Sequence, residues 1–296
     1  MYKNLNPAAL GVSGRQSELI ELTLTYGFDG LDLEASELLK RATLQGVEEA
    51  AKYIRSGNVK VGGWSLPAQL SANDRAFQTD LERLASLAPT AKEMGFNSCN
   101  ADIEPGSDDM PFHENFERHR ERLTKIGEVL QPLGIRVGLR LLPTAKQREG
   151  RKFPFIHQAE ELLTLVKTTN HKCVGLALDT WSWKVGGGAN DQLSELQGDQ
   201  IVTVCLADVP DDADLATVTT TERLLPTVDS VDEHAKLLVM LVERGYEGPV
   251  TIMPHSSQLA KLTRDVSVER CSTLLSNMWT AAGVPKEEAA EAEAGA

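Results

Sequence analysis

Residues 26–33, Tyr-Gly-Phe-Asp-Gly-Leu-Asp-Leu, contain the feature that decides the fold class. A helical stretch stops at Gly27, and an extended apolar run begins at Gly30. Glycine is favoured just past the end of a helix because it adopts the left-handed conformation without steric cost. The stretch therefore predicts a junction between a helix and a strand. The same pattern recurs at Gly95, Gly134 and Gly245.

The spacing of these four glycines predicts a repeating unit. The successive gaps are 68, 39 and 111 residues. They are close to two, one and three units of about 37 residues, which is one eighth of the chain. Apolar, strand-like runs fall where this period places them, and several lack the polar alternation of half-exposed strands, as expected of parallel strands covered on both faces. The runs are 8–10, 30–34, 59–64, 98–102, 135–141, 174–179, 201–208 and 249–253.

Eight strands in alternation with about eight helices favour a closed α/β barrel. We therefore expect a single (β/α)8 TIM barrel over residues 1–282, followed by an acidic, disordered tail over residues 283–296. Periodicity alone leaves a doubly wound sheet as the alternative. The longest non-periodic insert, residues 209–229, follows the seventh strand, and we expect it to cover the catalytic face as a lid or substrate loop.

Charge and composition exclude several classes of protein. A formal net charge of -13 over 296 residues opposes binding to nucleic acid or to anionic lipid. The first ten residues lack a secretory signal pattern, and no apolar run is long enough to span a bilayer, so we expect a cytoplasmic protein. The four cysteines are widely spaced without a Cys-x-x-Cys pair, which argues against a disulfide framework or a zinc knuckle.

The predicted carboxyl ends of the strands are unusually polar. In a TIM barrel the catalytic side chains come from these positions. Aromatic residues accompany the charged ones, as in sugar-binding clefts, where ring faces pack on the sugar and polar groups bind its hydroxyls. Any one of these residues could instead cap the following helix or face solvent. The set is Glu34, Trp64, Asp102, Glu104, Arg140, Asp179, Trp181, Asp208 and His255.

From about residue 5 to residue 279, the chain resembles the xylose isomerase-like TIM barrels, a family of sugar phosphate isomerases and epimerases related in fold to endonuclease IV. Besides residues 26–33, the matching stretches include Gly-Leu-Ala-Leu-Asp-Thr-Trp over 175–181, Glu-Arg-Leu-Leu-Pro over 222–226 and Gly-Tyr-Glu-Gly-Pro-Val-Thr over 245–251. Residues 111–123 and 200–209 match as well. The resemblance implies a barrel that acts on a small carbohydrate, without naming which one.

The resemblance also implies where a metal ion would bind. Family members hold a divalent cation, Mn, Mg, Co or Zn, through two glutamates, an aspartate and a histidine at the ends of strands five to eight, and such a cation polarises a carbonyl or hydroxyl. These four positions align here with Arg140, Asp179, Cys205 and Met253, so one ligand is retained. We therefore expect no metal cofactor, and a divalent ion (Mn, Mg, Co or Zn) is the alternative. Asp208 and the substrate-loop Arg223 match the family pattern.

Arg140 would place a fixed positive charge near the position of the missing cation. We expect it to form a salt bridge with Asp179. With Lys146 and Arg223 it could also recognise a carboxylate or phosphate on a ligand. Asp179 and Asp208 are the candidate catalytic residues. The candidate substrate-binding residues are Glu34, Trp64, Glu104, Arg140, Lys146, Trp181, Arg223 and His255.

Three functions stay open on the sequence. The first is a family member that binds a small carbohydrate or sugar acid without metal-dependent turnover. The second is an active isomerase or epimerase with a rearranged acid/base site formed by Glu34, Glu104, Asp179 and Asp208. The third is a non-catalytic scaffold or regulatory barrel. Family analogy also allows a homo-oligomer.

Overall fold

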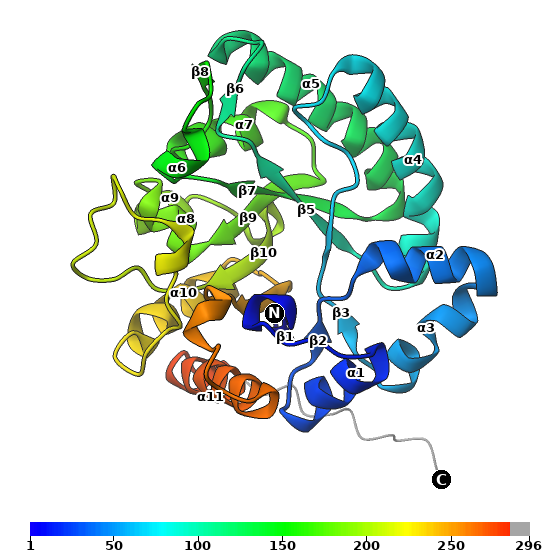
Figure 1. Ribbon diagram of the computed structural model, residues 1–296, viewed down its shortest axis with the longest axis vertical. Coiled ribbons are helices and arrows are strands. Elements are labelled where there is room, and N and C mark those ends of the chain that lie inside the picture. The colour runs from blue at the N-terminus through cyan, green and yellow to red at the C-terminus, as the bar shows by residue number, and fades with distance from the viewer. Residues whose placement is uncertain (285–296) are drawn as a thin grey trace.

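The computed structural model describes residues 1–284, and its centre is a curled parallel sheet surrounded by helices (Figure 1). The strand order is β3-β2-β1-β11-β10-β9-β7-β5-β4, and every neighbouring pair is parallel. The strands are β1 (Tyr2–Leu5), β2 (Gly30–Leu31), β3 (Lys60–Val61), β4 (Trp64–Ser65), β5 (Ser98–Ile103), β7 (Arg136–Leu141), β9 (Val174–Asp179), β10 (Ile201–Leu206) and β11 (Pro249–Ile252).

The barrel closes where the chain passes from β3 to β4. These are the two ends of the strand order, and only Gly62 and Gly63 separate them. The segment pairs with β2 before the two glycines and with β5 after them, so it acts as one strand that changes partner. A β-carbon at position 62 would lie 2.0 Å from Oδ1 of Asp32, so the backbone there must be glycine for this carboxylate to fit. Counted this way, the sheet has the eight strands of a TIM barrel.

The predicted αβ junctions are confirmed. Gly27, Gly95, Gly134 and Gly245 all have positive φ values, between 64° and 93°, and a strand begins a few residues after each of them. The prediction of a first strand at residues 8–10 was wrong. Those residues form a 3-10 helix, η1 (Ala8–Leu10), because Pro7 already holds a helical φ of -61°, and the first strand is β1 instead.

The longer helices lie outside the sheet (Figure 1). Helix α5 illustrates why: Leu123, Ile126 and Leu130 fall on one face and are fully buried. The helices are α1 (Gln16–Thr25), α2 (Ala35–Gln45), α3 (Val47–Ser56), α4 (Asp74–Glu93), α5 (Phe112–Leu130), α6 (Ala145–Arg148), α7 (Ala159–Thr169), α8 (Thr180–Val185), α9 (Asn190–Ser194), α10 (Val231–Glu243) and α11 (Arg264–Ala281).

The loops after the strands carry the remaining structure. A short antiparallel pair, β6 (Gly106–Ser107) with β8 (Phe153–Pro154), joins the loops that follow β5 and β7. The insert at residues 209–229 contains the 3-10 helix η4 (Thr220–Glu222), and a small second apolar cluster of Trp181, Ala207, Val209 and Val218 lies at its base.

Two further predictions concern the C-terminal tail and membrane-spanning segments. The tail predicted from residue 283 lies outside the described residues from residue 285 onward. Among residues 1–284, no helix has both the length and the apolar character needed to cross a membrane.

Candidate functional site

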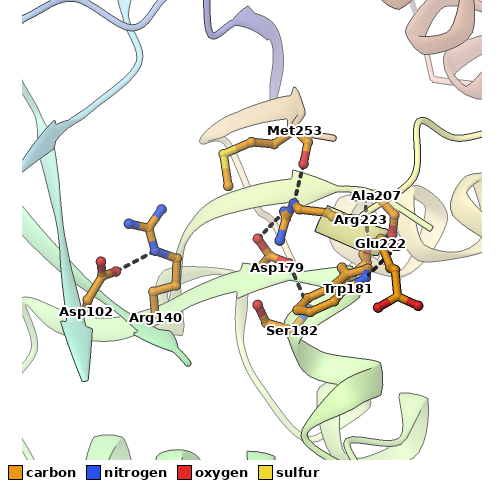
Figure 2. Close-up of polar contacts among 10 residues, drawn as sticks. Asp102, Arg140, Asp179, Trp181, Ser182, Ala207, Glu222, Arg223 and Met253 are labelled. Atoms are coloured by element: carbon orange, nitrogen blue, oxygen red, sulfur yellow. Dashed lines mark hydrogen bonds and ion pairs between the residues drawn. The ribbon is translucent and has the colours of Figure 1, made fainter. Parts of the chain in front are cut away.

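Asp179, at the carboxyl end of β9, is the centre of a polar cluster at the barrel mouth. Its side chain is 2% exposed. Oδ1 accepts a hydrogen bond of 2.9 Å from the backbone N–H of Ser182 and so caps α8. Oδ2 accepts a short hydrogen bond from Nη2 of Arg223, which forms a buried ion pair (Figure 2). The carboxylate is therefore held on both oxygens.

Arg223 lies just after η4 in the insert, and three contacts hold its guanidinium in place. Besides the pair with Asp179, Nε donates a short hydrogen bond to the backbone carbonyl of Met253 at the end of β11. The guanidinium carbon also lies 5.8 Å from the ring centre of Trp181. The Trp181 indole N–H in turn donates to the carbonyl of Glu222, at 3.3 Å. The insert is thus tied to the ends of β9 and β11 through one arginine.

Arg140 contacts Asp102 and not Asp179, so the predicted salt bridge between Arg140 and Asp179 was wrong. Strands β5 and β7 are neighbours whose register places Asp102 opposite Arg140, and Nε lies 2.5 Å from Oδ1 of Asp102. Burial has the largest single effect on Arg140 and lowers its pKa, but the hydrogen bond to Asp102 and the charges of Asp102, Cys205 and Asp179 together outweigh burial and raise the pKa. Asp179 is matched instead by Arg223, which the sequence offered no means of placing beside it.

Cys205, on β10, lies among these charged groups. Its thiol is influenced electrostatically by Asp179, Arg223, Arg140 and Asp32 together. Burial is the main cause that raises the pKa of this thiol, to about 12. Because the thiolate is the reactive form, Cys205 is a protonated, unreactive group near neutral pH.

Asp32 is a mouth residue that the sequence analysis missed. It follows β2 and accepts hydrogen bonds of 2.8 Å from the side-chain amides of Asn4 and Asn6. Burial raises its pKa to about 6, against the opposing effect of these amides and of the positive charge on Arg140. The side-chain alternation of a strand could have found it, since Asp32 lies two residues after Gly30 and on the same face.

A cavity of about 400 Å³ opens at the barrel mouth. Both arginines border it, together with Asp179, Trp181 and His255. The side chain of Asn6, which Asp32 fixes, also lines it. The structure therefore brings together five of the residues predicted for the site: Arg140, Asp179, Trp181, Arg223 and His255.

Other predicted site residues lie elsewhere. Glu34 is exposed and caps α2 through Ser36. Glu104 pairs with Arg151 at 3.4 Å, away from the cavity. The exposed Lys146 on α6 does not line the cavity, whereas its neighbour Gln147 does. Trp64 is 5% exposed and packs against Phe96 in the core, with ring centres 5.9 Å apart.

Asp208 follows β10 and faces a second, lateral cavity of about 480 Å³ between α8, α9 and α10. Its Oδ1 lies 2.6 Å from Nε2 of His234, which is almost fully buried on α10. Burial has the largest single effect on Asp208 and raises its pKa, but the hydrogen bonds with His234, Ser230 and the Thr227 backbone, with the charge of His234, together outweigh burial and lower the pKa. The four carboxylates of the predicted acid/base site therefore lie in separate places: Asp179 borders the mouth cavity and Asp208 the lateral one, whereas Glu34 caps α2 and Glu104 pairs with Arg151.

The donor groups at the mouth do not fit a divalent cation. Of the four positions aligned with family ligands, Asp179 alone has a side-chain carboxylate, and Arg223 occupies it. The backbone carbonyl of Met253 also accepts from Arg223. Across residues 1–284, no three His, Cys, Asp or Glu side chains lie close enough to hold a metal ion.

Comparison with known proteins gives the family. Residues 20–269 match the model of the xylose isomerase-like TIM barrel family. The chain belongs to this family. The resemblance seen in the sequence and the barrel fold are thus both confirmed.

Several relatives of the xylose isomerase-like barrel are sugar isomerases or epimerases. An inosose isomerase from Bacillus subtilis (strain 168) is 23% identical over 147 residues, which span 50% of this chain and 50% of that protein. A xylose isomerase domain protein from Alicyclobacillus acidocaldarius has a TM-score of 0.83 at 22% identity, covering 95% of this chain and 99% of the other. D-psicose 3-epimerase from Clostridium cellulolyticum H10, solved with D-tagatose, has a TM-score of 0.68 at 17% identity, covering 95% and 99%.

Proposed function

We propose that this xylose isomerase-like barrel binds a small carbohydrate or sugar acid at its mouth and does so without a divalent metal ion. The observation that carries the proposal is the buried ion pair between Asp179 and Arg223. Asp179 is the one carboxylate left at the family's ligand positions, and its partner is a permanent cation on the same chain.

Electrostatics explains why the ion pair and a metal ion exclude each other. A divalent cation near Asp179 would lie beside the guanidinium of Arg223, and two like charges repel strongly where water is scarce. Removing Arg223 from the carboxylate would in turn leave a buried arginine without its counter-charge. The protein therefore carries its own positive charge where family relatives would bind one.

The lining of the mouth cavity supports a carbohydrate as the ligand. Trp181, Met253 and Pro254 are apolar residues of the lining. Arg140, Arg223 and His255 supply hydrogen-bonding groups at the same cavity. Small-molecule sites combine apolar walls with a few placed polar groups in this way. One relative is named for the cyclitol ketone inosose, and another is a D-psicose 3-epimerase solved with D-tagatose; these small polyhydroxylated compounds favour a similar ligand class here.

Thermal unfolding with manganese tests the metal-free part of the proposal. A site of micromolar affinity would stabilise the folded state by about 3 kcal/mol at a hundredfold excess of ligand over Kd, which would raise Tm by several degrees. We expect no such rise, and no aldose–ketose interconversion when manganese is added. A clear gain in either would contradict the proposal.

Variants designed to gain metal binding test the alignment of this chain with the family's ligand positions. Arg140→Glu alone should not restore metal binding, since Cys205 and Met253 would still lack ligand groups. The triple variant Arg140→Glu, Cys205→His and Met253→Glu rebuilds the family's ligand set, and the addition of Arg223→Gln frees Asp179 for the metal. We expect manganese binding to appear only in the fourfold variant; binding by the wild-type chain would overturn the proposed function.

A further inference from the structure

We infer that the ligand of the barrel mouth carries a carboxylate and that the terminal nitrogens of Arg140 bind it. This inference rests on the proposed function and narrows it, because it selects a sugar acid over a neutral sugar. It also assigns a task to a residue that stands where family relatives carry a glutamate.

Two of the three guanidinium nitrogens of Arg140 remain available as hydrogen-bond donors. Asp102 engages Nε, at the side of the guanidinium. Nη1 and Nη2 have no hydrogen-bond partner among residues 1–284, and Figure 2 shows both of them pointing away from Asp102. The side chain is 29% exposed, and it lines the mouth cavity. The pair with Asp102 therefore orients the guanidinium and leaves its end-on edge open to the cavity.

The open edge of a guanidinium matches one kind of ligand group best. Two parallel N–H groups in a rigid plane fit the two oxygens of a carboxylate or phosphate, and they can only donate. Arg223 borders the same cavity and adds a second positive charge, with Nη1 not engaged by Asp179 or Met253. Two arginines, one on strand β7 and one in the insert, thus converge on one cavity.

The charge balance of the mouth favours a carboxylate over a phosphate. The two guanidinium groups lie among three carboxylates, Asp32, Asp102 and Asp179. A phosphate monoester carries nearly two negative charges at neutral pH, whereas a sugar acid carries one. Repulsion from the three carboxylates therefore opposes the phosphate more strongly. A sugar acid meets the open donors of Arg140 with the smaller excess of negative charge.

Because Asp32 changes charge near pH 6, the affinity of the mouth for an anionic ligand and for a neutral ligand should depend on pH in different ways. The titratable and charged groups that act on its carboxylate are Arg140, Cys205 and Tyr2, and only Asp32 among them changes charge near pH 6. As pH falls through about 6, Asp32 takes up a proton and its repulsion of a bound anion is lost. An anionic ligand should therefore bind more tightly at pH 5.5 than at pH 7.5. A neutral sugar that donates a hydroxyl to ionised Asp32 should show the opposite slope.

Calorimetric titration with ligands of one skeleton tests the inference. The probes are D-glucuronate, D-glucose and D-glucose 6-phosphate, with D-gluconate and D-glucitol as an open-chain pair. We expect one carboxylate ligand to bind about tenfold or more tightly than its neutral counterpart, the range that a charged hydrogen-bonding pair supplies. Arg140→Gln should remove that advantage, so that the carboxylate ligand binds no more tightly than its neutral counterpart, while Lys146→Gln, which removes the same charge outside the cavity, should leave the advantage in place.

Each outcome decides between the inference and the proposed function. Equal binding of carboxylate and neutral ligands, or an Arg140→Gln variant that keeps the preference, overturns the inference and leaves the proposed function standing. An Arg140-dependent preference for D-glucose 6-phosphate overturns the choice of carboxylate. Binding of none of the probes counts against the proposed function itself. If Arg140→Gln does not fold, the pH slope of the wild-type protein still decides, because tighter anion binding at higher pH contradicts the inference.

Discussion

The barrel mouth and the lateral cavity use the same residue type at the ends of neighbouring strands, for different purposes. Asp179 after β9 is paired with an arginine that stays charged at every accessible pH. Asp208 follows β10 and is paired with His234, whose charge depends on pH. The lateral cavity is the larger of the two, about 480 Å³ against about 400 Å³. Two arginines with open donors nevertheless border the mouth, whereas the lateral cavity is lined by Lys184, so chemistry and not volume identifies the candidate site.

The insert at residues 209–229 separates these two regions. It contributes Thr220 and Arg223 to the mouth, and Val209, Pro210, Asp211, Leu224, Thr227 and Asp229 to the lateral cavity. The backbone of Leu224 pairs with that of Asp208 in both directions, at 2.9 and 3.1 Å. Asp208 therefore anchors one side of the loop while Asp179 anchors the other through Arg223. Substituting Asp179 and Asp208 one at a time tests whether the two anchors differ in strength.

Asp179→Ala should have the largest effect. It leaves the guanidinium of Arg223, whose side chain is 11% exposed, without its counter-charge, and breaking one partner of a buried ion pair typically costs about 3–5 kcal/mol. Asp208→Ala removes a hydrogen bond to a residue that can become neutral, so we expect a loss of about 1–3 kcal/mol. Urea unfolding of both variants measures the difference. Equal losses would mean that the two anchors are equivalent.

Gly62→Ala should come next. The new β-carbon would lie 2.0 Å from Oδ1 of Asp32 and within 2.6 Å of the Asn4 amide, so the floor of the mouth must shift. Overpacking of this kind costs about 1–3 kcal/mol. Gly63→Ala is the matched control, because its nearest neighbour would be Oγ of Ser98 at 3.4 Å. Circular dichroism melts compare them, and a Gly63→Ala variant as unstable as Gly62→Ala would show that the strand break alone requires glycine.

The contribution of Asp208 to the stability of the fold should be lost in acid. The pKa of Asp208 is lowered in the folded protein, so its contribution to stability is present above the unfolded-state pKa of about 4 and is lost as pH falls through the folded-state value. Asp208→Asn should therefore lower Tm at pH 7 and lose this disadvantage towards pH 3. Melting curves of wild type and variant across this range check it. A difference that persists unchanged in acid would assign the effect to packing.

Trp64→Phe should have the smallest effect on the site. The indole N–H of Trp64 is buried without a hydrogen-bond partner, and the ring packs in the core, away from the mouth cavity. We expect ligand affinity to stay within about twofold of wild type, because Trp64 does not line the mouth cavity and independent sites influence each other by no more than about 0.3–0.5 kcal/mol. Titration of the variant with the preferred sugar acid measures this. A tenfold loss would place Trp64 back in the site.

Much of the barrel could be predicted because its signals are local. The junction glycines are required wherever a helix ends in the left-handed conformation, and all four have positive φ values. The first strand was missed for a local reason too: the apolar residues after Pro7 continue its helical φ into η1. The strand at residues 59–64 was predicted as one unit, but Gly62 and Gly63 divide its pairing between two neighbours.

The site could be predicted only in part because its contacts are not local. Arg223 reaches Asp179 across 44 positions of the chain, from an insert whose path no periodicity describes. A residue's position near the end of a strand also did not predict the direction in which its side chain points. Glu34 has already turned into the cap of α2, whereas Asp32, two residues earlier, faces the inside of the barrel.

Titration of the chelator-treated protein with manganese in a calorimeter tests most directly whether Asp179 belongs to Arg223 or to a metal ion. The buried ion pair predicts no heat of binding in the micromolar range. Binding at micromolar manganese would contradict it, would show that a cation displaces Arg223 from Asp179 or finds another set of carboxylates, and would restore a metal-dependent isomerase as the function of this barrel.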